Sequence, residues 1–160
     1  MRKEEEGTGV LGPMKGFKFE HGEEVCYLFS NDLPTLKLWR DAMSSRLNQR
    51  GFHELFKPIK KIGKGNFASV YLAIRLEDEK KFAIKAFSKE ATYAEDKGKE
   101  SLVNEIELMR RFNHKNLMKL FEVYESQNSI YVSVELLEGG QLYDKIKAKQ
   151  QLVDASAQNT

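Results

Sequence analysis

The chain has 160 residues, of which 41% are hydrophobic and 31% are charged, and its formal net charge is +2. This composition suits one soluble packed domain, or one small domain with a fragment of another. The near-neutral charge gives no reason to expect nucleic acid or an anionic membrane as the main partner. Cys26 has no second cysteine to pair with, the amino terminus is charged, and no apolar stretch is long enough to span a bilayer. We therefore expect a cytoplasmic protein.

The first part of the chain predicts a leader followed by two strands. Residues 1–14 are polar and contain glycine, so we expect a disordered leader. Short strands are expected at 17–19 and 24–29, on either side of a His21-Gly22 turn.

A helix is expected to follow from about Pro34 to Leu47, with Asp32 as its N-cap. Its apolar residues recur at spacings of three and four and form one face, which consists of Leu36, Trp39, Met43 and Leu47. Charge and glycine break this pattern over residues 48–55, and residues 51–55 are predicted to be a linker.

From Phe56 onward the strand signals are denser. Five strands are expected, with a helix after the third, and the Glu77-Asp78-Glu79-Lys80 turn makes the second and third strands a hairpin. The strands cover 56–62, 70–76, 81–87, 117–124 and 130–137, the helix covers 99–112, and a last short helix covers 142–150. This order predicts an α+β fold, with a five-stranded antiparallel sheet and one inserted helix, preceded by the strand–strand–helix fragment.

A glycine-bearing turn connects the first two strands of the predicted sheet. It reads Ile62-Gly63-Lys64-Gly65-Asn66-Phe67-Ala68-Ser69-Val70. Glycine lets backbone N–H groups approach a phosphate closely. Most such runs are instead simple hairpins in which glycine accepts a positive φ, so the turn alone leaves both interpretations open.

Lys85 lies on the next strand, on the same face as Ala83 and Phe87. A strand lysine is usually a solvated edge residue, but a lysine among apolar neighbours needs an anionic partner. Glu105 is the only charge within the apolar arc of the predicted helix, which consists of Leu102, Ile106, Leu108, Met109 and Phe112. The alternative is that Glu105 lies at the edge of the arc and extends its carboxylate into water. The pattern favours an ion pair between Lys85 and Glu105, which joins sheet and helix.

Together, the glycine-rich turn, Lys85, Glu105 and the apolar strand before Gly139-Gly140 resemble the small lobe of eukaryotic protein kinases over residues 56–150. The segment after that strand is most similar to Ser/Thr kinases of the calcium/calmodulin-dependent group. The resemblance implies that ATP is bound beneath the turn formed by residues 62–70. It also implies that Glu105 orients Lys85 toward the α- and β-phosphates.

The same resemblance assigns residues 130–137 to the last small-lobe strand and the hinge. Val134 would be the gatekeeper at the back of the adenine pocket. The Glu135 carbonyl and the Leu137 N–H would hydrogen-bond the base. The residues that would enclose the adenine ring are Ile62, Val70 and Ala83.

Two positions depart from the family pattern. Ala68 stands where a third glycine is usual, so one methyl group is added where the backbone nears phosphate. Gln141 stands where related kinases usually carry a glutamate that contacts ribose or a basic substrate residue, which puts a preference for basic substrates in doubt.

The 160 residues contain no His-Arg-Asp catalytic loop, no Asp-Phe-Gly motif and no Ala-Pro-Glu segment. The resemblance implies Mg²⁺ as a cofactor, but its family ligands are absent, so no metal site is expected in the chain. We therefore expect the ATP-binding portion of a protein serine/threonine kinase, inactive alone, whose parent phosphorylates protein substrates. The alternative is a non-catalytic interaction or scaffold module with a kinase-like lobe.

Residues 15–50 also resemble the carboxyl-terminal end of a pleckstrin-homology (PH) domain, through two strands followed by a helix that bears Trp39. An ordinary strand pair and amphipathic helix packed on the lobe would give the same pattern. The lipid-binding loop of that family lies in earlier strands. A membrane lipid is therefore expected as a partner only if a complete domain exists in a longer parent.

Overall fold

The computed structural model of the chain describes residues 7–9 and 12–157. Within them, the strands form a three-stranded sheet of order β1-β2-β3 and a six-stranded sheet of order β4-β8-β9-β7-β6-β5. The strands are β1 (Gly7–Gly9), β2 (Gly12–His21), β3 (Glu24–Ser30), β4 (Asn48–Gln49), β5 (Phe56–Lys64), β6 (Ala68–Arg75), β7 (Lys81–Ser88), β8 (Leu120–Glu125) and β9 (Ser129–Val134). The helices are α1 (Leu33–Ser44), α2 (Phe52–Leu55), α3 (Lys89–Tyr93), α4 (Gly98–Arg111) and α5 (Leu142–Ala157).

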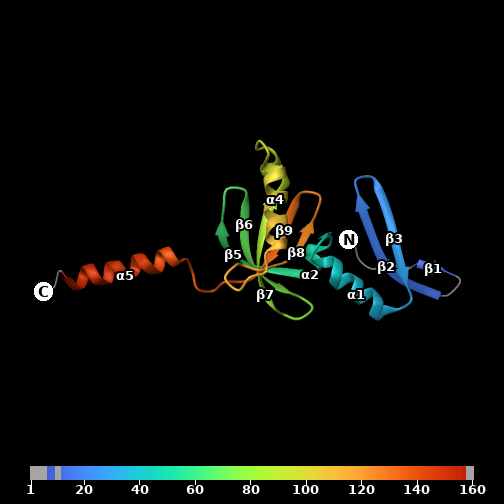
Figure 1. Cartoon of the computed structure of the whole chain (residues 1–160), viewed down its shortest axis with the longest axis horizontal. Coiled ribbons are helices and arrows are strands. Elements are labelled where there is room, and N and C mark those ends of the chain that lie inside the picture. Colours follow the sequence, from blue (N-terminus) through green and yellow to red (C-terminus); the bar gives the residue numbers. More distant parts are fainter. Residues whose placement is uncertain (1–6, 10–11, 158–160) are drawn as a thin grey trace.

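The six-stranded sheet forms the middle of the molecule (Figure 1). The three-stranded sheet lies toward one end, and α5 projects from the opposite end, away from the other elements. No helix in the described part of the chain is long and apolar enough to cross a membrane.

All five antiparallel strands predicted from Phe56 onward are present, as β5 to β9. The structure adds a sixth strand, since β4 pairs in parallel with β8 through Asn48↔Val123 and Gln49↔Tyr124. The single inserted helix becomes two, because the short helix α3 precedes α4. The predicted α+β fold is therefore confirmed, with these additions.

One face of the six-stranded sheet packs against α4. Residues alternate between the two faces of a strand, so Ala83 and Phe87 of β7 lie on this face together with Lys85. The buried side chains of this core are Ala83, Phe87, Leu102, Ile106, Val123, Ile130, Val132 and Val134. Burial of these apolar groups is the main force that holds α4 on the sheet.

The opposite face of the sheet carries an aromatic core. Phe52 of α2 stacks on Tyr131 with ring centroids 4.1 Å apart and on Phe56 at 5.3 Å. The buried members of this core are Phe52, Phe56, Ala73, Phe82, Ile84 and Tyr124. Packed aromatic pairs of this kind add stabilisation beyond the area they bury.

Residues 51–55, predicted to be a linker, belong to this packed lobe. Gly51 adopts a φ of +80°, which lets the chain turn from β4 into α2. Phe52 is only 5% exposed. The linker prediction failed because Phe52 and Leu55 are the only large apolar residues in the segment, which is too few to indicate packing from sequence. Phe52 nevertheless fills the aromatic core.

The three-stranded sheet and α1 form an N-terminal unit. Strands β2 and β3 pair from Lys15↔Ser30 to His21↔Glu24 around Gly22, so the predicted hairpin is present and longer than expected. The disordered leader expected over residues 1–14 is corrected at Gly7–Gly9 and Gly12–Met14, which lie in paired strands. The rest of that range lies outside the described residues.

Helix α1 differs in detail from its prediction. Asp32 precedes the helix, but its carboxylate accepts a hydrogen bond from the Thr35 hydroxyl at 2.5 Å and caps no backbone N–H. Of the predicted apolar face only Leu36 is buried, while Trp39 is 51% exposed. The strand–strand–helix order expected of a PH-like fragment is present, and membership of that family stays a prediction.

Candidate functional site

The glycine-rich turn joins β5 to β6. Its closing contact is a hydrogen bond of 2.8 Å from the Gly65 N–H to the Ala68 carbonyl, and Lys64 pairs with Ser69 across the hairpin. Neither Gly63 nor Gly65 has a positive φ. A methyl group would make only ordinary contacts, 3.4 Å from the Val70 Cβ at Gly63 and 3.7 Å from the Ala68 carbonyl at Gly65. The hairpin itself therefore does not require these two glycines, which favours a requirement from outside the chain, such as close approach of a ligand.

Lys85 lies on β7 between Val70 of β6 and Val132 of β9. Its side chain is 28% exposed, and its Nζ lies 3.2 Å from Glu105 Oε1 on α4. The predicted ion pair between sheet and helix is therefore present. The role of this pair in nucleotide binding is a separate prediction.

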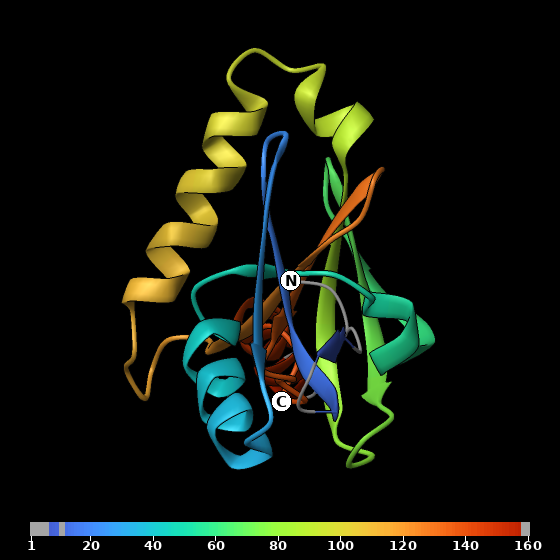
Figure 2. The same ribbon diagram turned by 90° about the vertical axis from the view of Figure 1, so that its right-hand side faces the viewer.

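The orientation of α4 differs from the predicted arc. Leu102 and Ile106 are its buried residues, while Leu108 and Phe112 are more than half exposed. Glu105 therefore lies at the flank of the buried stripe and not at its centre, and its side chain is 48% exposed. Figure 2 shows α4 (yellow) standing beside the strands, with one side open.

The segment expected to be a hinge follows β9. Val134 is 1% exposed and pairs with Ala83 of β7 at the back of this face. The Glu135 N–H donates to the Lys119 carbonyl at 2.9 Å. Within the described residues, no partner is found for the Glu135 carbonyl or the Leu137 N–H. One acceptor and one donor are therefore left free where the sheet ends.

Two of the three predicted adenine-enclosing residues form an apolar wall on the α4-facing side of the sheet. Val70 and Ala83 are packed with the α4-facing core, whereas Ile62 is 44% exposed. Leu137 is 64% exposed. Asn66 and Phe67 lie in the turn between β5 and β6, and Ser69 belongs to β6.

Two polar residues near the site were missed by the sequence analysis. Arg110 lies outside the predicted apolar arc, yet its side chain is only 14% exposed and donates to Asn48 Oδ1 at 2.9 Å. Asn48 was expected to precede a linker. The helical spacing Leu102–Ile106–Arg110 was the available signal, since these residues follow one another at intervals of four on adjoining turns.

The matching family model agrees with this geometry. Residues 56–160 match the protein kinase domain, so the chain belongs to the protein kinase domain family.

Known relatives extend the comparison. The chain is 34% identical over 144 residues to a probable serine/threonine-protein kinase (fhkC) of Dictyostelium discoideum. The aligned segment covers 88% of this chain and 24% of that kinase. It is 36% identical over 106 residues to calcium-dependent protein kinase 4 of Plasmodium falciparum, covering 66% of this chain and 20% of the relative. It is 38% identical over 100 residues to calcium/calmodulin-dependent protein kinase type 1 of Caenorhabditis elegans, covering 61% and 28%. The chain thus spans about a quarter of the length of these relatives.

Proposed function

We propose that this lobe binds ATP on the sheet face that carries Ala83, Lys85 and Val134, beneath the glycine-rich turn. The observation that carries the proposal is the 3.2 Å ion pair between Lys85 and Glu105, next to a turn whose glycines the hairpin does not require. The relatives named as serine/threonine kinases support a parent protein of that class. In such a parent, the γ-phosphate of ATP would pass to a protein hydroxyl group.

Lys85 and the glycine-rich turn would bind the phosphates. An ammonium group has three N–H donors, so Lys85 can keep one contact with Glu105 and direct the others toward phosphate oxygens. Backbone N–H groups at the tip of the turn, other than that of Gly65, which donates to the Ala68 carbonyl, would cover the phosphates from above. Glu105 would orient the lysine and would touch no substrate itself.

The base would occupy the other end of the wall. Val70 and Ala83 offer an apolar surface for the adenine ring, and Val134 closes its back. The Glu135 carbonyl could accept from the exocyclic amine, and the Leu137 N–H could donate to a ring nitrogen. These two backbone groups would select adenine by hydrogen bonding.

The chemical step requires groups beyond those described here. Among the described residues, no group of three His, Cys, Asp or Glu side chains is placed to hold a metal ion. Mg²⁺, which the family uses with ATP, would neutralise phosphate charge, and the sequence contains neither the Asp-Phe-Gly motif nor the His-Arg-Asp loop that would hold it in the family. We propose that this chain supplies nucleotide binding and phosphate orientation only.

The test is a fluorescence titration of the chain with the nucleotide analogue MANT-ATP, alongside thermal shift with ATP. Lys85→Met should weaken binding by about 10- to 100-fold, because it removes a charged hydrogen bond to phosphate. Lys81→Met is the matched control, since Lys81 is the exposed first residue of the same strand. It should bind as the unmodified chain does.

Two results would count against the proposal. One is an absence of binding by the unmodified chain at millimolar nucleotide, and the other is an equal loss in the Lys81 and Lys85 variants. Either outcome would favour the alternative of a lobe that acts as an interaction module.

A further inference from the structure

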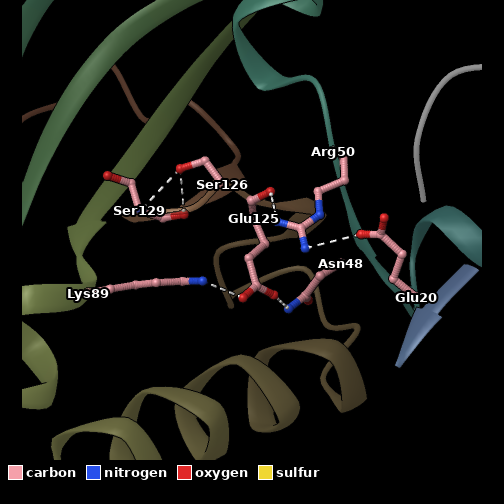
Figure 3. A network of polar contacts seen from close by, with 7 residues as sticks. All are labelled: Glu20, Asn48, Arg50, Lys89, Glu125, Ser126 and Ser129. Atoms are coloured by element: carbon pink, nitrogen blue, oxygen red, sulfur yellow. Dashed lines mark hydrogen bonds and ion pairs between the residues drawn. The ribbon is translucent and has the colours of Figure 1, made fainter. Parts of the chain in front are cut away.

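Glu125, at the end of β8, is the centre of a polar network that joins distant parts of the chain (Figure 3). Its carboxylate accepts from Lys89 Nζ at 2.5 Å and from Asn48 Nδ2 at 2.9 Å. Its backbone carbonyl accepts from Arg50 Nη1 at 3.1 Å. Burial raises the pKa of the Glu125 carboxyl, but the hydrogen bonds from Lys89 and Asn48 lower it further, so the net pKa is below the ordinary value. The carboxylate is therefore ionised at neutral pH and accepts from both Lys89 and Asn48.

Asn48 connects this network to α4. While its amide nitrogen donates to Glu125, its amide oxygen accepts from Arg110 Nη2 at 2.9 Å. The backbone of Asn48 is fixed at the same time by its pairing with Val123 in the sheet. A single side chain thus uses both its donor and its acceptor to join β8 to the end of α4.

Elsewhere, the helix is held by apolar packing against the sheet. Its buried residues are Leu102 and Ile106. Glu105 and Arg110 lie on opposite flanks of this stripe, about 140° apart around the helix axis. Among the described residues, the polar contacts that tie α4 to the sheet are Glu105 with Lys85 and Arg110 with Asn48. One contact on each flank opposes rotation of the helix about its axis.

The two contacts differ in exposure. Lys85 and Glu105 are 28% and 48% exposed, so solvent screens their attraction and the pair alone holds the helix weakly. Arg110 is 14% exposed, and its partner is a part-buried amide fixed in the sheet. The Arg110 contact is therefore the firmer of the two.

We propose that Asn48 and Arg110 are positioning residues for the Lys85–Glu105 pair. By holding the carboxyl-terminal half of α4 against β8, they keep Glu105 within reach of Lys85. Arg50 connects these contacts to the N-terminal unit, because its Nη2 also lies 3.4 Å from Glu20 Oε2 on β2. The unit that precedes the lobe can thereby act on the nucleotide site through residues 48–50. The effect on nucleotide rests on the proposed function, whereas the effect on α4 does not.

The first test is hydrogen–deuterium exchange of the full chain without nucleotide. Asn48→Leu removes both side-chain hydrogen bonds at similar volume and should speed exchange in residues 98–111. Asn48→Asp is the second variant, since it has the same shape and keeps the acceptor but loses the donor to Glu125. The matched control is Asn104→Leu on the exposed side of α4, which should leave exchange unchanged. Unchanged exchange in both folded Asn48 variants would overturn the proposal.

The second test is binding of MANT-ATP. Asn48→Leu should weaken binding about 3- to 30-fold, the range typical of residues that modulate a site without contacting the ligand. In a Glu105→Gln background the same change should have no further effect, because the positioning acts through Glu105. An equal loss in both backgrounds would show a merely structural role and overturn the proposal.

The two tests separate the two proposals. If the unmodified chain fails to bind MANT-ATP while exchange in α4 still rises in the Asn48 variants, the proposed function fails and the positioning of α4 stands. If binding is normal and neither exchange nor affinity responds to Asn48, the positioning role is wrong and the nucleotide site stands.

Discussion

At the scale of single residues, the turn between β6 and β7 contains a compact ion pair. Arg75 donates to both carboxylate oxygens of Asp78, through Nε at 2.9 Å and Nη2 at 2.6 Å. Lys80 lies 3.1 Å from the same carboxylate. The hydrogen bonds from Arg75 hold the pKa of Asp78 well below its ordinary value of 3.8, and Lys80 adds to the effect. This turn precedes the strand that carries Lys85.

The lowered pKa of Asp78 predicts an acid-sensitive contribution to stability. A carboxyl with a depressed pKa in the folded state stabilises the fold above its unfolded pKa, and this contribution is lost as pH falls through the folded pKa. Asp78→Asn should therefore lower the melting temperature at pH 7, and its difference from the unmodified chain should shrink as pH falls below about 4. Thermal unfolding followed by circular dichroism checks this. Glu77→Gln in the same turn is the control, and a difference independent of pH would contradict the prediction.

At the scale of elements, the aromatic core makes α2 a structural part of the lobe. Phe52 stacks on both Tyr131 and Phe56, which belong to β9 and β5 at positions far apart in the sheet order. A helix of four residues has little stability of its own. The position of α2 is therefore set by the burial of Phe52. Without α2, this face of the sheet would lose part of its cover.

This packing predicts the effect of truncating Phe52. Phe52→Ala should lower the free energy of unfolding by about 3–5 kcal/mol, as large-to-small changes in a core do. Leu55→Ala in the same helix should cost much less, because Leu55 is 38% exposed. Urea unfolding of the two variants checks the difference. A loss below about 1 kcal/mol for Phe52→Ala would mean that the segment behaves as the linker first predicted.

The same elements show what the sequence can predict and why the rest escapes it. Strands β5 to β9 were predictable because runs rich in apolar, β-branched and aromatic residues are separated by turn residues, and Lys85 and Glu105 because charges stand out in apolar patterns. Strand β4 has only Asn48 and Gln49, and its partner strand lies more than seventy residues away in the chain. A two-residue strand carries no periodicity. The arc of α4 was too wide because exposed Leu108 and Phe112 look like core residues in sequence.

At the scale of the whole molecule, the family match and the folded lobe have different boundaries. The match begins at Phe56, at the first residue of β5. The sheet, however, includes β4, and the aromatic core includes α2, both of which precede that residue. The Asn48 side chain also holds Glu125 and Arg110. The folded unit therefore begins before the segment that the family shares.

This difference predicts how shortened chains behave. A chain of residues 45–160 keeps β4, α2 and the Asn48 contacts, whereas a chain of residues 56–160 loses all three. The shorter chain should be less stable by about 3–5 kcal/mol or more, since it lacks the side chain of Phe52 and leaves the aromatic core open. It should also show faster hydrogen exchange in α4, because Arg110 loses its acceptor. Urea midpoints and exchange rates for the two chains, compared with the full chain, test both points. Equal midpoints would mean that the lobe is complete from Phe56 onward and that β4 and α2 only rest on its surface.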